Sequence, residues 1–384
     1  MSVAGAHAPH GGTGERERLV EDFVRLCEIE SPSLHERPMA DAVAAELSML
    51  GLGVTEDASA AATGSDAGNL IARLPGPAGA PTILLCAHLD TVPLDGPVEI
   101  QRDGGVLRNR HQAILGADNK AAVAVILAAV RHHAERGGAP VGLELVFTTA
   151  EEPGLLGAKE LDRRALLSDF GFVFDHASPI GELITAAPTY YRLLARFTGA
   201  AAHAGIRPED GRNAIVAAGR AVAAMRLGRL DDQTTANAGI IEGGTARNVV
   251  AEHCQVELEA RSLDEGTADR AIAEMVDRCS DAAGDTECDV DTTVEQLCRA
   301  FRLARSAPPV RAAAWALEDL GIEPVYRSSG GGSDANALIA GGLCVLNVAN
   351  GTERNHQPDE RVTVEALETM LDVTLRIIER SAEV

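Results

Sequence analysis

One apolar segment that ends in a histidine and an aspartate constrains this chain more than any other feature. Residues 83–87 are all apolar, His88 and Asp90 follow them, and Pro93 ends the segment. A continuous apolar run is typical of a strand buried on both faces of a parallel sheet. Ligands bind beyond the carboxyl ends of such strands, and alternation places His88 and Asp90 on one face. The pair indicates either a metal ligand with its orienting carboxylate or a strand-ending histidine beside a solvated aspartate.

Length and charge limit the classes of protein to consider. The 384 residues are enough for two domains, and the net charge of −23 argues against nucleic acid and anionic membranes as partners. No apolar run approaches the ~20 residues of a membrane span. Residues 1–18 lack the apolar core of a secretory signal and are predicted to be disordered. Seven cysteines without paired spacing favour reduced thiols, so we expect a cytoplasmic protein.

Two further predicted strands also end in acidic residues. Residues 143–150 lead into Glu151 and Glu152, and residues 171–174 lead into Asp175. The intervals have the length of βαβ units, and right-handed crossovers would bring these strand ends to one edge of the sheet. Because adjacent side chains point in different directions, one glutamate could bind a metal ion while the other faces a water molecule.

Asp118 lies at the start of a predicted apolar helix that runs from Ala121 to about His133. Aspartate is a favoured N-cap residue, which is the simpler interpretation. It could also be a carboxylate that binds metal, placed where the helix dipole favours negative charge. The residues alone leave both alternatives open.

The pattern changes near residue 188. About four strands, with one strand segment expected at residues 249–251, and two helices over residues 188–300 predict a compact α+β domain, and the α/β pattern resumes afterwards. We therefore expect an α/β domain with a mixed or parallel sheet, built from residues 1–187 and 301–384. The inserted domain of residues 188–300 is expected to hold a four-stranded sheet and two helices.

Five motifs occur in one order along nearly the whole chain: His88–Pro93, Gly116–Ala122, Thr149–Gly154, Phe174-Asp175 and His356–Glu360. Together they resemble the di-metal peptidase and deacylase family that includes peptidase T, carboxypeptidase G, succinyl-diaminopimelate desuccinylase and aminoacylase. The glycine-rich segment Ser329–Asn336, with Asp175 at the third strand end, is most similar to the peptidase T-like branch.

The resemblance implies a site for two divalent metal ions, with zinc expected and manganese or cobalt as alternatives. It assigns His88 and Asp175 to one ion, Glu152 and His356 to the other, and Asp118 to both. By the same resemblance, Asp90 orients His88 and Glu151 is the general base.

In the inserted domain the resemblance points to substrate-binding residues. His203 would stabilise the tetrahedral oxyanion, and Asn248 and Arg261 would contact the substrate as a lid closes. Gly331 and Gly332 would approach a substrate carboxylate with their backbone. The resemblance also implies a homodimer formed through this lid domain.

The expected function is hydrolysis of an amide bond in short peptides, as by a tripeptide aminopeptidase. An N-acyl amino acid deacylase or a carboxypeptidase would use the same metal site. A non-enzymatic binding protein on this scaffold would have lost a ligand or Glu151, and neither is lost. A nucleotide-binding enzyme is disfavoured because the chain has no GxxxxGK[ST] motif.

Overall fold

The computed structural model describes residues 13–384, and this part of the chain forms two compact units. The first unit holds residues 13–185 together with Arg302–Ser328 and Ser333–Val384. The second unit holds Ala186–Phe301 and the short segment Ser329–Gly332. Each unit has its own cluster of buried apolar side chains.

The first unit is built on a mixed sheet with strand order β1-β2-β6-β3-β7-β16-β8-β14, and β15 also pairs with β8. Its strands are β1 (Val54–Glu56), β2 (Leu70–Leu74), β3 (Thr82–His88), β6 (Gly142–Thr148), β7 (Phe170–His176), β8 (Glu182–Ala187), β14 (Phe301–Arg302), β15 (Val325–Ser328) and β16 (Val345–Ala349). The four central strands, β6, β3, β7 and β16, are parallel, as the continuous apolar runs predict. Their carboxyl ends therefore lie along one edge of the sheet.

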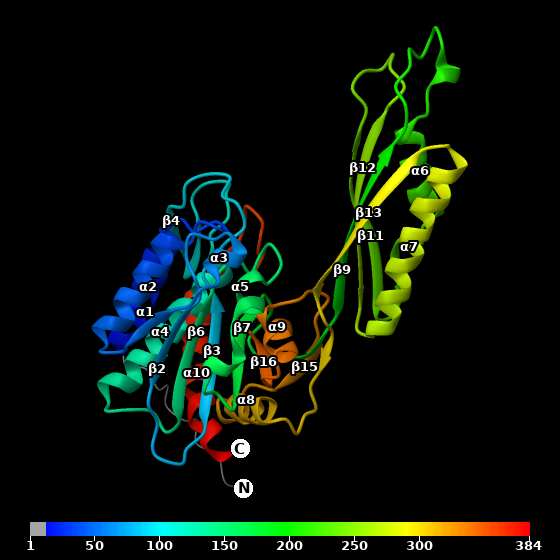
Figure 1. Cartoon of the computed structure of the whole chain (residues 1–384). Helices are drawn as coiled ribbons and strands as arrows, with labels where there is room; N and C mark the ends of the chain where they lie inside the picture. Colours follow the sequence, from blue (N-terminus) through cyan, green and yellow to red (C-terminus); the bar gives the residue numbers. More distant parts are fainter. Residues whose placement is uncertain (1–12) are drawn as a thin grey trace. The chain divides into compact units, whose positions relative to one another are not determined.

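Helices lie on both sides of this sheet (Figure 1). They are α1 (Thr13–Cys27), α2 (Arg37–Met49), α3 (Ala60–Thr63), α4 (Ala117–Glu135), α5 (Leu156–Glu160), α8 (Pro308–Asp319), α9 (Asp334–Ala340) and α10 (Val364–Arg380), with short 3₁₀ turns η1 (Arg163–Ala165) and η3 (Ser381–Glu383). Helix α4 packs against the central strands and against α1 and α10. A small antiparallel sheet of β17 (Arg361–Thr363), β5 (Val106–Asn109) and β4 (Ile100–Asp103) completes the unit.

The second unit is an antiparallel sheet, in the order β10-β11-β12-β9-β13, packed on two helices. Its elements are β9 (Thr189–Thr198), η2 (Pro208–Asp210), α6 (Ala214–Ala224), β10 (Gly228–Asp231), β11 (Thr234–Gly243), β12 (His253–Ser262), α7 (Glu265–Asp285) and β13 (Asp289–Cys298). The sheet has five strands, not the four that we predicted. The short strand β10 is largely exposed and polar, so it carries no apolar pattern that the sequence could reveal.

Two expectations from the sequence fail locally. The segment Val249–Ala251, expected to be a strand, makes only an isolated bridge between Val249 and His203. Residues 13–18, expected to be disordered, form the first turns of α1, where Arg16 pairs with Glu368 and Asp372 at 2.8 and 2.7 Å. The rest of the expected disordered segment, residues 1–12, lies outside the described residues.

All seven cysteines are free thiols, and six of them are buried. Within residues 13–384, no helix combines the length and the apolar character needed to cross a membrane.

Candidate metal centre and substrate-binding residues

Two histidines and four carboxylates gather at the carboxyl edge of the central strands. His88 ends β3, Glu151 and Glu152 follow β6, Asp175 lies at the end of β7, His356 follows β16, and Asp118 lies in the first turn of α4. Ligand atoms of His88, Asp118 and Glu152 lie within 4.8 Å of one another, and those of His88, Glu151 and Asp175 form a second such group. The structure thus brings together all the predicted metal ligands and the predicted general base.

Asp118 lies between the two histidines. Its Oδ1 is 3.3 Å from Nε2 of His88, and its Oδ2 is 3.2 Å from Nε2 of His356. His88 Nε2 is also 3.6 Å from Asp175 Oδ1, and His356 Nε2 is 3.0 Å from Glu152 Oε1. Asp118 is therefore shared by two sets of imidazole and carboxylate side chains. The adjacent Glu151 and Glu152 belong to different sets, with Glu151 near Asp175 and Glu152 near His356.

The backbone explains how Asp118 reaches this position. The regular part of α4 begins after a kink at Asp118 and Asn119, and the Asp118 carboxylate lies against two histidines instead of accepting from the first N–H groups of the helix, so the N-cap interpretation of Asp118 is wrong. Asp118 has φ −81° and ψ 106°, which is not helical, and its peptide bond to Asn119 is cis. Because the side chain does not cap the helix, both of its oxygens face the histidines.

Glu151 is buried, and Asp118, Glu152 and Asp175 are only 10–12% exposed; this low exposure affects the pKa values of the carboxylates. Burial, with the negative charge of Asp175, raises the pKa of Glu151 well above its ordinary value. Burial also raises the pKa values of Glu152 and Asp175. In the part of the chain from residue 13 onward, no lysine or arginine forms an ion pair with Asp118 or with these three carboxylates.

Neighbouring carboxylates raise the pKa values of both histidines. Burial lowers the pKa of His88, but hydrogen bonds with Asp118, Asp175 and Asp90 outweigh it and raise the pKa well above the ordinary value. Hydrogen bonds with Asp118 and Glu152 raise the pKa of His356 to about 10. Imidazole and carboxylate donors so crowded fit divalent cations such as zinc, which would neutralise the carboxylates and take the imidazole nitrogens as ligands.

Asp90 is fully buried and holds two parts of the site. Its Oδ1 lies 3.4 Å from Nδ1 of His88, while the backbone oxygen of Asp90 lies closer to that nitrogen, at 3.0 Å. Its carboxylate also accepts hydrogen bonds from the backbone N–H groups of Glu151 and Glu152, at 2.9 and 3.1 Å. Asp90 therefore positions the glutamate turn as well as the histidine, which the sequence analysis did not foresee.

Three further buried residues hold the ligand-bearing turns, and sequence reasoning gave none of them a role. Glu36 accepts a hydrogen bond of 2.9 Å from the N–H of Ala150, directly before the glutamates. Asn347 brackets Asp175, accepting from its N–H at 3.0 Å and donating to its carbonyl at 2.9 Å. Glu360 binds the backbone before Asp118. Only Glu360 lay in a recognised motif.

The predicted substrate-binding residues belong to the second unit. His203 is exposed, and its Nδ1 accepts a hydrogen bond of 3.2 Å from the N–H of Gly205. This bond fixes the tautomer, so Nε2 carries the proton and is a donor. Asn248 is exposed as well, and its backbone oxygen accepts a bond of 3.0 Å from the N–H of Ala204.

Arg261 is held more firmly than its predicted role suggests. Its guanidinium makes a two-pronged pair with Glu259 at 3.1 and 2.8 Å and lies 3.9 Å over the ring of Tyr190. It also donates a hydrogen bond of 3.1 Å to the carbonyl of Gly330, which ties it to the loop that contains Gly331 and Gly332. A Cβ at Gly331 would meet only the hydroxyl of Ser329, at 3.8 Å, so no neighbouring backbone requires glycine there.

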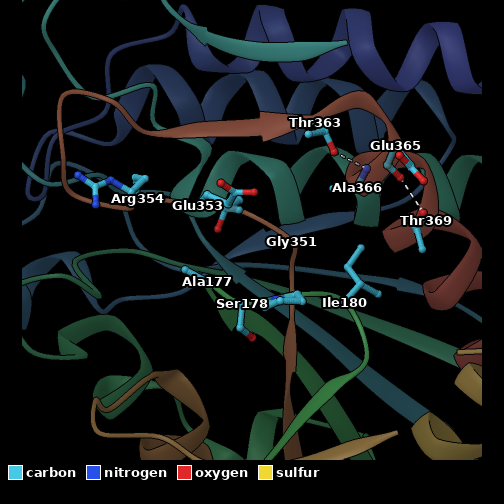
Figure 2. A pocket seen from close by; sticks show the side chains of 12 residues that line it. Ala177, Ser178, Ile180, Gly351, Glu353, Arg354, Thr363, Glu365, Ala366 and Thr369 are labelled. Carbon is cyan, nitrogen blue, oxygen red and sulfur yellow. Dashed lines mark hydrogen bonds between the residues drawn. The ribbon is translucent and has the colours of Figure 1, made fainter. Parts of the chain in front are cut away.

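A cavity of about 550 Å³ lies beside the segments that follow Asp175 and precede His356. Figure 2 shows its wall, formed by residues 177–180, 351–354 and the first turns of α10. Two of the three charged residues of this wall already have partners, because Glu353 pairs with Arg361 and Arg354 pairs with Asp359. The cavity adds space near the site but no metal-binding group of residues.

Comparison with known proteins gives matches along most of the chain. The model of peptidase family M20/M25/M40 matches residues 84–380 of this chain. The uncharacterized protein YqjE of Bacillus subtilis is 35% identical over 367 residues, which cover 96% of this chain and 99% of that protein. The solved structure of aminopeptidase PepT from Bacillus cereus has a TM-score of 0.86 and 36% identity, covering 96% of this chain and 99% of the other. A tripeptidase from Staphylococcus aureus has a TM-score of 0.91 and 32% identity, with the same two coverages.

Proposed function

Since the chain belongs to peptidase family M20/M25/M40, we propose that it is a metal-dependent aminopeptidase that releases the first residue of tripeptides. The observation that carries the proposal is the position of Asp118, whose two carboxylate oxygens face two different imidazoles at 3.3 and 3.2 Å. A carboxylate in this position could hold two divalent ions, one with each histidine.

The residues divide into two ligand sets. His88, Asp118 and Asp175 would hold one ion, and Asp118, Glu152 and His356 would hold the other. When bound, the ions would polarise the scissile carbonyl and lower the pKa of the attacking water to ~7. We expect zinc from the mixture of imidazole and carboxylate donors, with manganese or cobalt as alternatives.

Glu151 is proposed as the general base. It is buried beside His88 and Asp175, and burial raises its pKa, as is common for the general bases of enzymes. Its carboxylate would take a proton from the attacking water and deliver it to the leaving amine. Asp90 would support this step by holding the backbone N–H of Glu151.

The second unit is proposed to bind the substrate. The Nε2–H of His203 would donate a hydrogen bond to the oxyanion of the tetrahedral intermediate. Asn248 and Arg261 would bind the peptide backbone or its carboxylate, together with the N–H groups of Gly331 and Gly332. The exposed state of His203 and Asn248 supports a role in binding, because neither side chain is committed to the core.

The tripeptide specificity rests on two relatives, the aminopeptidase PepT and the tripeptidase, which are 36% and 32% identical over 96% of this chain. The same two-metal site would also serve a carboxypeptidase or an N-acyl amino acid deacylase. The three activities differ in the substrate that they require. An aminopeptidase needs a free amino group, a deacylase needs a blocked one, and a carboxypeptidase removes the residue at the carboxyl end.

A substrate panel tests this requirement directly. The metal-free enzyme is reconstituted with zinc, manganese or cobalt and given free tripeptides, the same tripeptides with an acetylated amino terminus, and N-acetyl amino acids. We expect release of the first residue from free tripeptides only. Glu151→Gln, assayed in parallel, shows which turnover belongs to the site.

Each result of the panel has a distinct meaning. Turnover of acetylated amino acids alone would replace the aminopeptidase proposal with the deacylase. Release of the carboxyl-terminal residue would replace it with the carboxypeptidase. Two bound ions with no turnover of any substrate would contradict an enzymatic function and favour a binding protein.

We also propose that the chain forms a homodimer through the second unit. Strand β10 pairs with β11 only at residues 234–236, so residues 237–243 form an edge without a second strand partner among the described residues. Ile240 and Ile241 on this edge are 47% and 53% exposed. Apolar edge strands are usually covered, and a second copy could cover this one by adding its own strand. The free thiols support a cytoplasmic location for such a dimer.

The molar mass in solution tests the dimer. We expect light scattering at micromolar concentration to give twice the chain mass for the wild type and the chain mass for Ile241→Glu. The matched control is Val294→Glu, which changes a residue that is 43% exposed on β13, the other edge of the same sheet, and should leave the dimer intact. A monomeric wild type, or equal effects of both substitutions, would refute the proposed interface.

A further inference from the structure

Glu360 is a buried carboxylate that the proposed mechanism does not use. It is 1% exposed, and both of its oxygens accept hydrogen bonds from backbone N–H groups. Oε2 accepts from Leu115 at 2.7 Å and from Gly116 at 2.8 Å, and Oε1 accepts from Asp118 at 2.9 Å. One side chain thus holds the whole segment that leads into the shared ligand.

This segment needs an external acceptor. The N–H groups at the start of a helix have no partner within the helix, and Gly116 has no side chain with which to cap α4. Asp118 departs from helical geometry, with ψ at 106°, so the regular hydrogen bonds of α4 do not fix its orientation. The three bonds to Glu360 therefore define where the Asp118 backbone lies.

Glu360 also belongs to the segment that carries His356. Residues 353 and 361 form a backbone pair, with hydrogen bonds of 3.0 Å in both directions, and His356 lies in the turn between them. Within that turn the N–H of Glu360 donates to the carbonyl of Gln357 at 3.0 Å. His356 has φ of 63°, a conformation that a residue with a side chain rarely adopts unless its surroundings hold it.

We propose that Glu360 is a positioning residue that sets the separation of Asp118 and His356, the two ligands that lie 3.2 Å apart in the second ligand set. Its carboxylate connects two segments that are 242 residues apart in the chain, and both segments carry a ligand to the same ion. The inference rests on the proposed two-metal site. It adds that the ion held by Asp118, Glu152 and His356 depends on Glu360 more than the other ion does.

Metal binding to Glu360→Gln tests this dependence. Glutamine keeps the size of the side chain but replaces one acceptor oxygen with an NH₂ group, which cannot accept from a backbone N–H. Dissociation constants for Zn²⁺ are measured by competition with a chromogenic chelator, and the visible spectrum of the Co²⁺ form reports ligand geometry. We expect one of the two ions to bind about 10- to 100-fold more weakly, with a changed Co²⁺ spectrum, and the other ion to bind nearly as in the wild type.

Glu144→Gln is the matched control. Glu144 is also a buried carboxylate of the first unit, and it accepts backbone hydrogen bonds from Leu167 and Ser168 at 2.9 and 3.0 Å, but these residues carry no metal ligand. The Glu144→Gln variant should lose thermal stability without a change in either Zn²⁺ dissociation constant or in the Co²⁺ spectrum. If Glu360→Gln does not fold, Glu360→Asp replaces it, because it keeps the charge but is one methylene too short to reach all three donors.

The outcomes separate the two proposals. Wild-type metal affinity and spectrum in folded Glu360→Gln or Glu360→Asp would overturn the positioning role and leave the two-metal site standing. Equal weakening by Glu144→Gln would also overturn it, because the effect would then be one of general stability. A wild type that binds a single ion would refute the proposed site itself, and the positioning role with it.

Discussion

The two units of this protein hold their candidate functional residues in opposite ways. In the first unit His88 is buried and the candidate carboxylate ligands are only 10–12% exposed, although His356 is 49% exposed, and several of these groups are fixed from behind, as Asp90 fixes His88 and the backbone of Glu151. In the second unit His203 and Asn248 are exposed. Nδ1 of His203 accepts a hydrogen bond from the N–H of Gly205 in the same loop, and only the backbone oxygen of Asn248 accepts one, from the N–H of Ala204. Buried charges without partners are costly, so a site made of them requires a surrounding shell of hydrogen bonds.

This difference suggests a difference in what each unit contributes. A fixed cluster of buried carboxylates suits chemistry, because its groups are already placed where charge develops. Exposed groups on a separate unit suit contact with a substrate that must enter and leave. Substitutions in the first unit should therefore change the chemical step most, and those in the second unit should change it less.

Glu151→Gln is expected to have the largest effect. The amide cannot accept a proton from water, so kcat should fall by about 10³-fold, within the range found for general bases. Because Glu151 is not proposed as a ligand, the metal content should remain at two ions per chain. Metal analysis and steady-state kinetics on the same preparation test both statements. A loss of one ion would show instead that Glu151 binds metal, as its position within 4.8 Å of His88 and Asp175 would permit.

His203→Ala is expected to have a smaller effect, of about 10²-fold on kcat, which is typical of removing one oxyanion donor. The metal content and the thermal stability should not change, because the side chain is exposed. His203→Gln, whose amide N–H can still donate, should recover part of the lost rate. Unchanged kcat in His203→Ala would limit the second unit to a role other than transition-state contact.

The sequence was informative where the physics is local. Continuous apolar runs predicted the central parallel strands, and the motifs at their ends predicted the family, which the comparison confirms. The strand β10 and the early start of α1 were missed, because neither has an apolar pattern that extends into those residues. The shell around the site was missed for a different reason. The bond between Asp118 and Glu360 joins residues 242 positions apart, and no local pattern records such a contact.

The smallest expected effect concerns His133, a buried histidine without a carboxylate partner in the described part of the chain, which can be compared with His88 among its carboxylates. His133 is 7% exposed, and within residues 13–384 its Nε2 has no hydrogen-bond partner. Burial, with the nearby charge of His132, lowers its pKa to about 4, whereas His88, surrounded by carboxylates, shifts the other way. The unfolded chain binds this proton at a pKa of ~6.5, so stability falls as the pH drops from about 6.5 to about 4.

The comparison of wild type with His133→Gln isolates this contribution. Between pH 7.5 and pH 5 the wild type should lose about 1 to 2 kcal/mol of unfolding free energy relative to the variant, since partial solvent access reduces the full linkage value. Urea unfolding at the two pH values measures the difference, and His35→Gln, at an exposed histidine of the same unit, is the control. A constant difference between wild type and His133→Gln would mean that the protein accommodates the charged imidazole. Burial by itself would then not account for the pKa of a histidine in the first unit. The raised pKa of His88 could in that case not be explained as carboxylates merely compensating for its burial.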